Sequence, residues 1–181
     1  MKIAIIFKSI TGNTQILAEA VREALRPEEI LYFGGLEEWN ARPDPKDTPD
    51  LYIVGSWTDK GMCDANIGAF LQTLRGESIA YFGTAGFGGA KEYYQKLFQN
   101  VTSNIDRSNR ILGFFFCQGK MPITVKERYE KMLAEHPEDP RWQRSLDNFD
   151  RAGSHPDAED CQQVQRWLEQ EILPKVERAR P

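Results

Sequence analysis

Short apolar runs alternate with stretches of helical periodicity along most of this chain of 181 residues. Within 12–26, for example, apolar residues recur at steps of three and four, which is typical of an amphipathic helix. Such an alternation predicts βαβ units, in which helices join parallel strands. We therefore expect an α/β fold, a doubly wound three-layer α/β/α sandwich with a five-stranded parallel sheet. The strands are expected at Lys2–Phe7, Glu29–Phe33, Leu51–Val54, Ser78–Phe82 and Arg110–Phe116.

The remaining segments complete a single domain, residues 1–181. Helices are expected at about 12–26, 66–74, 90–99 and 124–135, and a proline-rich connection at Arg42–Pro49. Residues 136–153 read as a polar insertion before the last helix, with Trp142 and Phe149 as anchors onto the body of the domain. The last helix is expected to begin near Ser154, because Asp157 follows three residues later as in a capping box.

Charge, apolar runs and cysteine content limit the partners, the location and the metal or disulfide sites that this protein can have. The formal net charge is -4, which argues against nucleic acid as a main partner and suits docking to a basic patch on another protein. No apolar run reaches the roughly 18–20 residues that span a bilayer, and no signal peptide is recognised. Three widely spaced cysteines predict neither a metal centre nor a disulfide framework. A cytoplasmic protein is expected, with Cys117 as a buried apolar residue.

Ligands of doubly wound sheets bind where the strands end, at their carboxyl edge, so the loops there are the most informative segments. The first strand is followed by Ser9-Ile10-Thr11-Gly12-Asn13-Thr14, which opens a helix. Backbone N–H groups at a helix start carry partial positive charge, hydroxyls add donors, and Gly12 lets the backbone approach an anion. This loop therefore predicts a phosphate site. The alternative is a polar turn that only caps the helix.

Two further loops carry aromatic and glycine residues. The third strand is followed by 55–64, where Trp57 would expose a large apolar surface unless a flat ligand covered it. The fourth strand is followed by Gly83-Thr84-Ala85-Gly86-Phe87-Gly88-Gly89, whose glycines permit positive φ and close approach of a ligand. Alternatively, Trp57 packs beneath its own loop, Lys60 is a solvated surface charge, and the glycine-rich loop is a flexible turn.

Several other phosphate and signalling sites are excluded by what these loops lack. There is no G-K-[ST] run of a Walker loop and no dinucleotide fingerprint after the first strand. Ser9 and Ser56 stand where a phosphoacceptor receiver needs acidic residues, and no Cys-x5-Arg run follows the first strand. We also find no general base, nucleophile or metal set that implies catalysis without a cofactor.

Together these loops resemble those of the flavodoxin family, including its members in anaerobic bacteria that accompany other reductases. The run 9–14 resembles the T/S-x-T-G-x-T phosphate loop, and Trp57 matches an aromatic residue that stacks on the flavin. The resemblance covers about residues 1–116 and implies strand order 2-1-3-4-5, bound FMN, and electron transfer to a partner reductase or oxidoreductase. The cofactor-binding residues that it implies are Ser9, Thr11, Gly12, Asn13, Thr14, Ser56, Trp57, Thr58, Lys60, Gly61, Thr84, Ala85, Gly86, Phe87, Gly88 and Gly89.

Two other functions are compatible with the same fold. An FMN-dependent NAD(P)H oxidoreductase would reduce a small substrate held above the flavin. A binding module would have kept the fold and lost FMN. An electron carrier is favoured over both.

Overall fold

The computed structural model describes residues 1–42, 47–103 and 105–178, and it contains a mostly parallel sheet. The strands are β1 (Ile3–Lys8), β2 (Ile30–Gly35), β3 (Leu51–Asp59), β4 (Met62–Cys63), β5 (Ser78–Ala85) and β6 (Arg110–Gln118). The main sheet has the order β2-β1-β3-β5-β6. This order confirms the predicted topology, with the expected fourth and fifth strands appearing as β5 and β6.

The sixth strand, β4, was not predicted. It pairs antiparallel with the end of β3, so that Thr58 faces Cys63 and Asp59 faces Met62. Lys60 and Gly61 form the two-residue turn between them, with φ of 48° and 83°. A tight hairpin turn of this kind needs positive φ at both central positions, which glycine adopts without strain.

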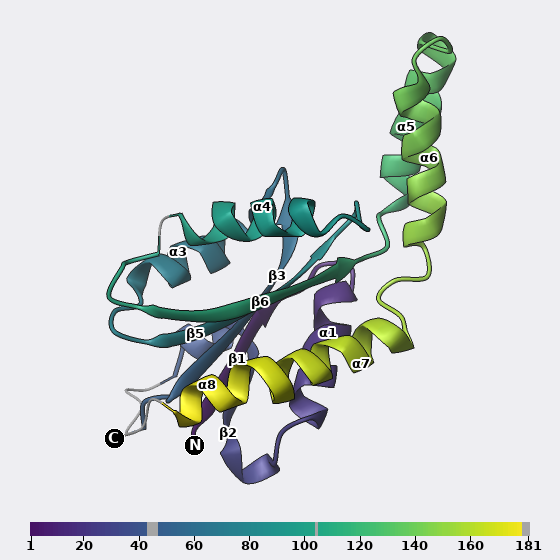
Figure 1. Ribbon diagram of the computed structural model, residues 1–181. Coiled ribbons are helices and arrows are strands. Elements are labelled where there is room, and N and C mark those ends of the chain that lie inside the picture. The colour runs from purple at the N-terminus through teal and green to yellow at the C-terminus, as the bar shows by residue number, and fades with distance from the viewer. Residues whose placement is uncertain (43–46, 104, 179–181) are drawn as a thin grey trace.

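Helices cover both faces of the sheet (Figure 1). One face carries α1 (Asn13–Glu23) and a continuous C-terminal helix made of α7 (Ala158–Trp167), the π-helical segment η2 (Leu168–Ile172) and α8 (Leu173–Glu177). The other carries the short α2 (Leu36–Asn40), α3 (Ala65–Thr73) and α4 (Lys91–Thr102). A short 3₁₀ turn, η1 (Pro27–Glu29), follows α1.

Two apolar cores lie on either side of the sheet because successive strand residues point to opposite faces. In β1, Ile3 and Ile5 pack with α1 and α7, while Ala4 and Ile6 pack toward α3 and α4. All four side chains are fully buried. The near-continuous apolar character of these strands therefore follows from a sheet that is covered on both faces.

The segment predicted as a polar insertion is largely helical. α5 (Ile123–Glu135) and α6 (Pro140–Ala152) form a helical hairpin that projects from the carboxyl end of β6 (Figure 1). The expectation that Trp142 and Phe149 anchor the segment onto the body was wrong. Trp142 packs against Tyr129 of α5 at 6.4 Å between ring centroids, and Phe149 lies under Lys126. Both residues therefore hold the two arms of the hairpin together.

Four expected boundaries also differ. The last helix begins at Ala158 rather than near Ser154, because its N-cap is Asp157, which forms a capping box with Asp160. The strands β3, β5 and β6 each run beyond their predicted ends, so that Trp57, Thr84 and Ala85 lie in strands and not in loops. Residues 43–46 of the expected proline-rich connection lie outside the described residues.

Among the described helices, none is both long and apolar enough to cross a membrane.

The three cysteines are free thiols and differ in burial. Cys117 is 5% exposed, which confirms the prediction, and burial raises the thiol pKa of all three cysteines. Since the thiolate is the reactive form, we expect Cys161, which is half-buried, to react first with Ellman's reagent at neutral pH. Cys63 and Cys117 should react only after denaturation. Rapid loss of all three thiols in the folded protein would contradict this packing.

Candidate functional site

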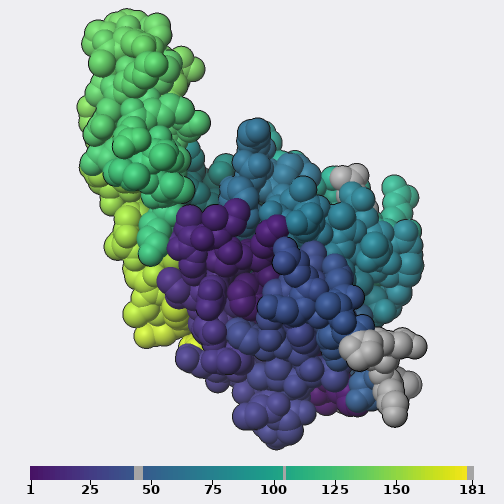
Figure 2. All heavy atoms as spheres, turned by 180° about the vertical axis from the view of Figure 1, so that it is seen from behind, coloured from purple at the N-terminus to yellow at the C-terminus, as the bar shows by residue number. Residues whose placement is uncertain are grey.

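The loop after β1 meets the ends of the neighbouring strands at the carboxyl edge of the sheet. The Thr14 and Thr84 hydroxyls lie 3.3 Å apart, and Trp57 of β3 pairs in register with Thr84 of β5. In Figure 2 the N-terminal segment (purple) lies beside the base of the helical hairpin (green). The structure thus brings the first predicted loop together with the ends of β3 and β5.

The start of α1 has the features of an anion site. Its N-cap is Gly12, with φ of 87°, so the N-cap residue itself supplies no side-chain hydrogen bond. A Cβ built on Gly12 would meet no atom within 4 Å, so the approach to the helix start is open. Uncapped N–H groups at a helix start, together with the helix dipole, favour a bound anion.

Side chains around this helix start are fixed in different ways. Ser9 Oγ accepts a hydrogen bond from the Gln15 N–H at 3.3 Å, and Thr11 is exposed. Asn13 is buried and donates from Nδ2 to the Lys120 carbonyl at 2.8 Å. Its Oδ1 is buried without a hydrogen-bond partner among the described residues. Such an acceptor is uncommon in folded proteins, and here it is free to accept a hydrogen bond from a ligand.

The end of β3 supplies an aromatic side chain and a rigid turn. Trp57 is half-buried, and its Nε1 has no partner within the described part of the chain. Ser56 is fully buried: its hydroxyl donates to the Trp57 carbonyl at 2.8 Å and accepts from the Asp64 N–H at 2.9 Å. Ser56 therefore fixes the β3–β4 hairpin. Thr58 lies in that hairpin, beyond Trp57.

Lys60 and Gly61 lie at the tip of this hairpin, and Lys60 is exposed. The Gly61 carbonyl accepts a hydrogen bond from Asn100 Nδ2 of α4 at 2.9 Å. Asn100 was not identified from the sequence, since a single asparagine within a helix carries no motif.

The glycines after β5 serve packing more than backbone freedom. Of Gly83, Gly86, Gly88 and Gly89, only Gly89 has positive φ. A Cβ on Gly86 would lie 2.6 Å from Met121 Sδ, and one on Gly88 would lie 2.9 Å from the Gln118 side chain. Thr84 and Ala85 are buried, whereas Phe87 is 44% exposed. The expectation that these glycines provide positive φ was therefore wrong except at Gly89.

Two cavities lie beside these loops. One, of about 610 Å³, lies between β1, α2 and α3 and contains Ser9 among the candidate residues. The other, of about 710 Å³, lies along the edge strand β6 and contains Gly89. Neither of these two cavities has Trp57 or Phe87 among its lining residues.

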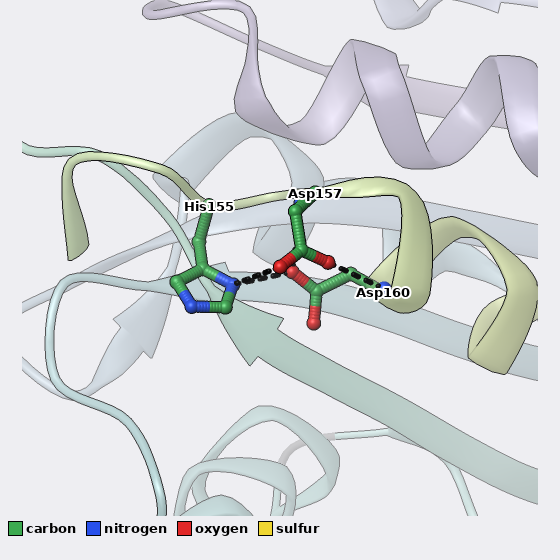
Figure 3. Close-up of side chains that lie close together, drawn as sticks. All are labelled: His155, Asp157 and Asp160. Carbon is green, nitrogen blue, oxygen red and sulfur yellow. Dashed lines mark hydrogen bonds and ion pairs between the residues drawn. The ribbon is translucent and has the colours of Figure 1, made fainter. Parts of the chain in front are cut away.

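A cluster of His155, Asp157 and Asp160 lies close to the loop after β6 (Figure 3). His155 Nδ1 lies 2.6 Å from Asp160 Oδ2, and the backbone N–H groups of Asp157 and Asp160 bond to each other's carboxylates. These groups cap α7. The His155 carbonyl also accepts from the Lys120 N–H at 2.9 Å, which ties the cap to the loop that covers Asn13.

Comparisons with known proteins agree on one family. The flavodoxin domain model matches residues 4–169. The chain is 37% identical over 180 residues to the flavodoxin-like domain-containing protein BilS of Clostridium symbiosum (strain WAL-14163), with 93% of this chain and 94% of that protein covered. It is 29% identical over 174 residues to the protein of the same name from Clostridioides difficile (strain CD3), with 96% and 97% covered.

Solved structures show the same fold. A flavodoxin from Streptococcus pneumonia TIGR4 matches with a TM-score of 0.55 at 15% identity, covering 97% of this chain and 99% of that one. A flavodoxin from the domain Archaea matches with a TM-score of 0.54 at 16% identity, covering 98% and 99%. The matched domain spans nearly the whole sheet and its helices, and on this evidence the chain belongs to the flavodoxin family.

Proposed function

We propose that this protein binds FMN at the carboxyl edge of its sheet and passes electrons to a partner oxidoreductase. FMN is the cofactor of the flavodoxin family, to which the chain belongs. The single observation that carries the proposal is the start of α1, whose glycine N-cap supplies no side-chain hydrogen bond and leaves the approach to the helix start open. The buried, unpaired Oδ1 of Asn13 beside it also fits a missing ligand group.

The loop after β1 holds the FMN phosphate in this proposal. The N–H groups at the start of α1 supply hydrogen bonds and the positive end of the helix dipole. The Ser9 and Thr11 hydroxyls add donors, and Gly12 leaves room for the oxygens. Asn13 and Thr14 keep the loop in place through Lys120 and Thr84.

Two segments bind the ring of FMN. The first segment is the end of β3 and its hairpin, with Trp57, Thr58, Lys60 and Gly61. The second segment is residues 84–89. Bound FMN accepts electrons singly or in pairs, and the protein contributes binding, orientation and electrostatics. Trp57 and Phe87 supply apolar surface that excludes water. Lys60 places a positive charge near the ring.

The surface around these loops suits contact with another protein. Ile10, Met62 and Phe87, one from each loop, are large apolar side chains that remain exposed. Exposed apolar side chains that gather on one side of a protein mark an interaction site. We assign the protein to the cytoplasm, where its three free thiols would stay reduced.

A stepwise reduction of the protein with added FMN tests this function. We expect the visible bands of FMN to shift on binding and the bound flavin to be reduced in two separate one-electron steps, without bleaching by NADPH alone. Fast bleaching by NADPH would indicate the FMN-dependent oxidoreductase instead. A protein that takes up no FMN would be the binding module, and the proposal would be wrong.

A further inference from the structure

The helical hairpin of α5 and α6 is connected to the loop between β5 and α4 (residues 86–90) by side-chain amides. The Gly86 carbonyl accepts hydrogen bonds from Asn148 Nδ2 of α6 at 2.9 Å and from Gln118 Nε2 of β6 at 3.1 Å. Gln118 Nε2 also lies 3.0 Å from Asn148 Oδ1. The three groups therefore form one closed network, with the loop carbonyl as the shared acceptor.

The burial of Asn148 shows that this network is part of the protein interior. Asn148 is 6% exposed, although it belongs to a helix whose neighbouring positions are mostly exposed or half-buried. A buried amide without partners costs free energy, so the hairpin can place asparagine there only because the loop and Gln118 satisfy it.

Anchoring this carbonyl fixes the direction of the next N–H. In a trans peptide the C=O and the N–H of the following residue point in opposite directions. With the Gly86 carbonyl directed to Asn148, the Phe87 N–H is directed away from the hairpin. The conformation of the loop is further restricted because Met121 and Gln118 pack directly against Gly86 and Gly88.

We propose that Asn148 is a positioning residue for the flavin-binding loop 86–90, and that the helical hairpin acts on the flavin through it. This inference rests on the proposed function. Asn148 does not itself contact the flavin in this proposal. It holds the Gly86 peptide and the adjacent exposed Phe87 in the orientation that the ring requires.

The test compares Asn148→Ala and Asn148→Asp with Tyr129→Leu. Asn148→Asp keeps the size and the acceptor for Gln118 but places an oxygen against the Gly86 carbonyl. Tyr129→Leu weakens the packing of the hairpin on Trp142 without touching the loop. Thermal melting of all three variants tests whether they are folded and compares their stabilities.

We expect both Asn148 variants to bind FMN about tenfold more weakly and to change the midpoint potential of the bound flavin, because one of the two side-chain hydrogen bonds to the Gly86 carbonyl is lost. Tyr129→Leu should change neither. An equal loss of FMN affinity in Tyr129→Leu would show that Asn148 acts only through hairpin stability, and unchanged affinity and potential in the Asn148 variants would also overturn the inference.

Hydrogen exchange on the FMN-free protein separates this inference from the proposed function. The amides of residues 86–90 should exchange faster in Asn148→Ala than in the wild type or in Tyr129→Leu. If the wild type binds no FMN, the proposed function fails, whereas the exchange rates still show whether Asn148 orders the loop. Unchanged exchange there would refute the positioning role itself.

Discussion

Thr11→Asp is expected to weaken FMN binding by about 100-fold while leaving the fold intact. Thr11 is exposed and directly precedes the N-cap Gly12, so its replacement meets no packing constraint. A carboxylate there repels the phosphate dianion, and an energy of about 2.7 kcal/mol corresponds to this loss of affinity. FMN titrations followed by flavin fluorescence measure the effect.

Two controls assign this loss to the phosphate. Thr11→Asn is similar in size to Thr11→Asp and uncharged, and we expect it to bind FMN within a few-fold of the wild type. Riboflavin lacks the phosphate, so its weaker binding should be nearly the same in all three proteins. If Thr11→Asp bound FMN as tightly as the wild type, the phosphate would not lie at the start of α1.

Phe82→Ala is expected to cost about 3–5 kcal/mol of unfolding free energy, because it removes a large side chain from the core. Phe82 is fully buried in β5, and its ring occupies the space above Gly55 of β3. A Cβ on Gly55 would lie 2.1 Å from the Phe82 ring. Denaturant unfolding of the FMN-free proteins measures the loss without a stabilising contribution from the ligand.

The contact between Phe82 and Gly55 makes a double-mutant cycle decisive. Gly55→Ala alone should destabilise the protein, because its methyl group meets the ring. In the Phe82→Ala background the same methyl group should fill part of the cavity and restore stability, which gives a large coupling energy. Additive effects of the two substitutions would mean that the ring does not pack over Gly55.

The sheet could be predicted from the sequence because its pattern is local. Each strand is a short apolar run, and burial on both faces leaves that signal uninterrupted. The strand ends could not be predicted, since β3 continues through Ser56 and Trp57 to Asp59 in residues that are polar or turn-forming. Pairing with β4 and a buried hydroxyl at Ser56 keep these residues extended, and both are tertiary effects.

The helix α6 could have been found. Pro140 stands at its first position, where proline is favoured because the missing N–H needs no partner. Trp142, Leu146 and Phe149 follow at helical spacing. The surrounding prolines and charges suggested a polar segment instead. The partners of the hairpin could not be found, because the bond from Asn148 to Gly86 joins residues 62 positions apart.

In the candidate site, the loop after β1 was the most predictable part, because its helix and its donors are adjacent in sequence. The position of the glycine-rich loop after β5 could be predicted, but the reason for its glycines could not. Glycine is required at 86 and 88 because the side chains of Met121, just after β6, and Gln118, at the end of β6, pack directly against these positions. A glycine that avoids a neighbouring side chain and one that approaches a ligand look alike in a single sequence.

The chain enters and leaves the helical hairpin at the same place. Lys120 lies just before the hairpin and His155 just after it. The Lys120 N–H donates a hydrogen bond to the His155 carbonyl at 2.9 Å. An insertion whose two ends are joined in this way adds little to the closure entropy of the rest of the chain. Its arms can therefore gain or lose whole turns at the tip during evolution, and we expect length differences among relatives to gather around residues 131–144.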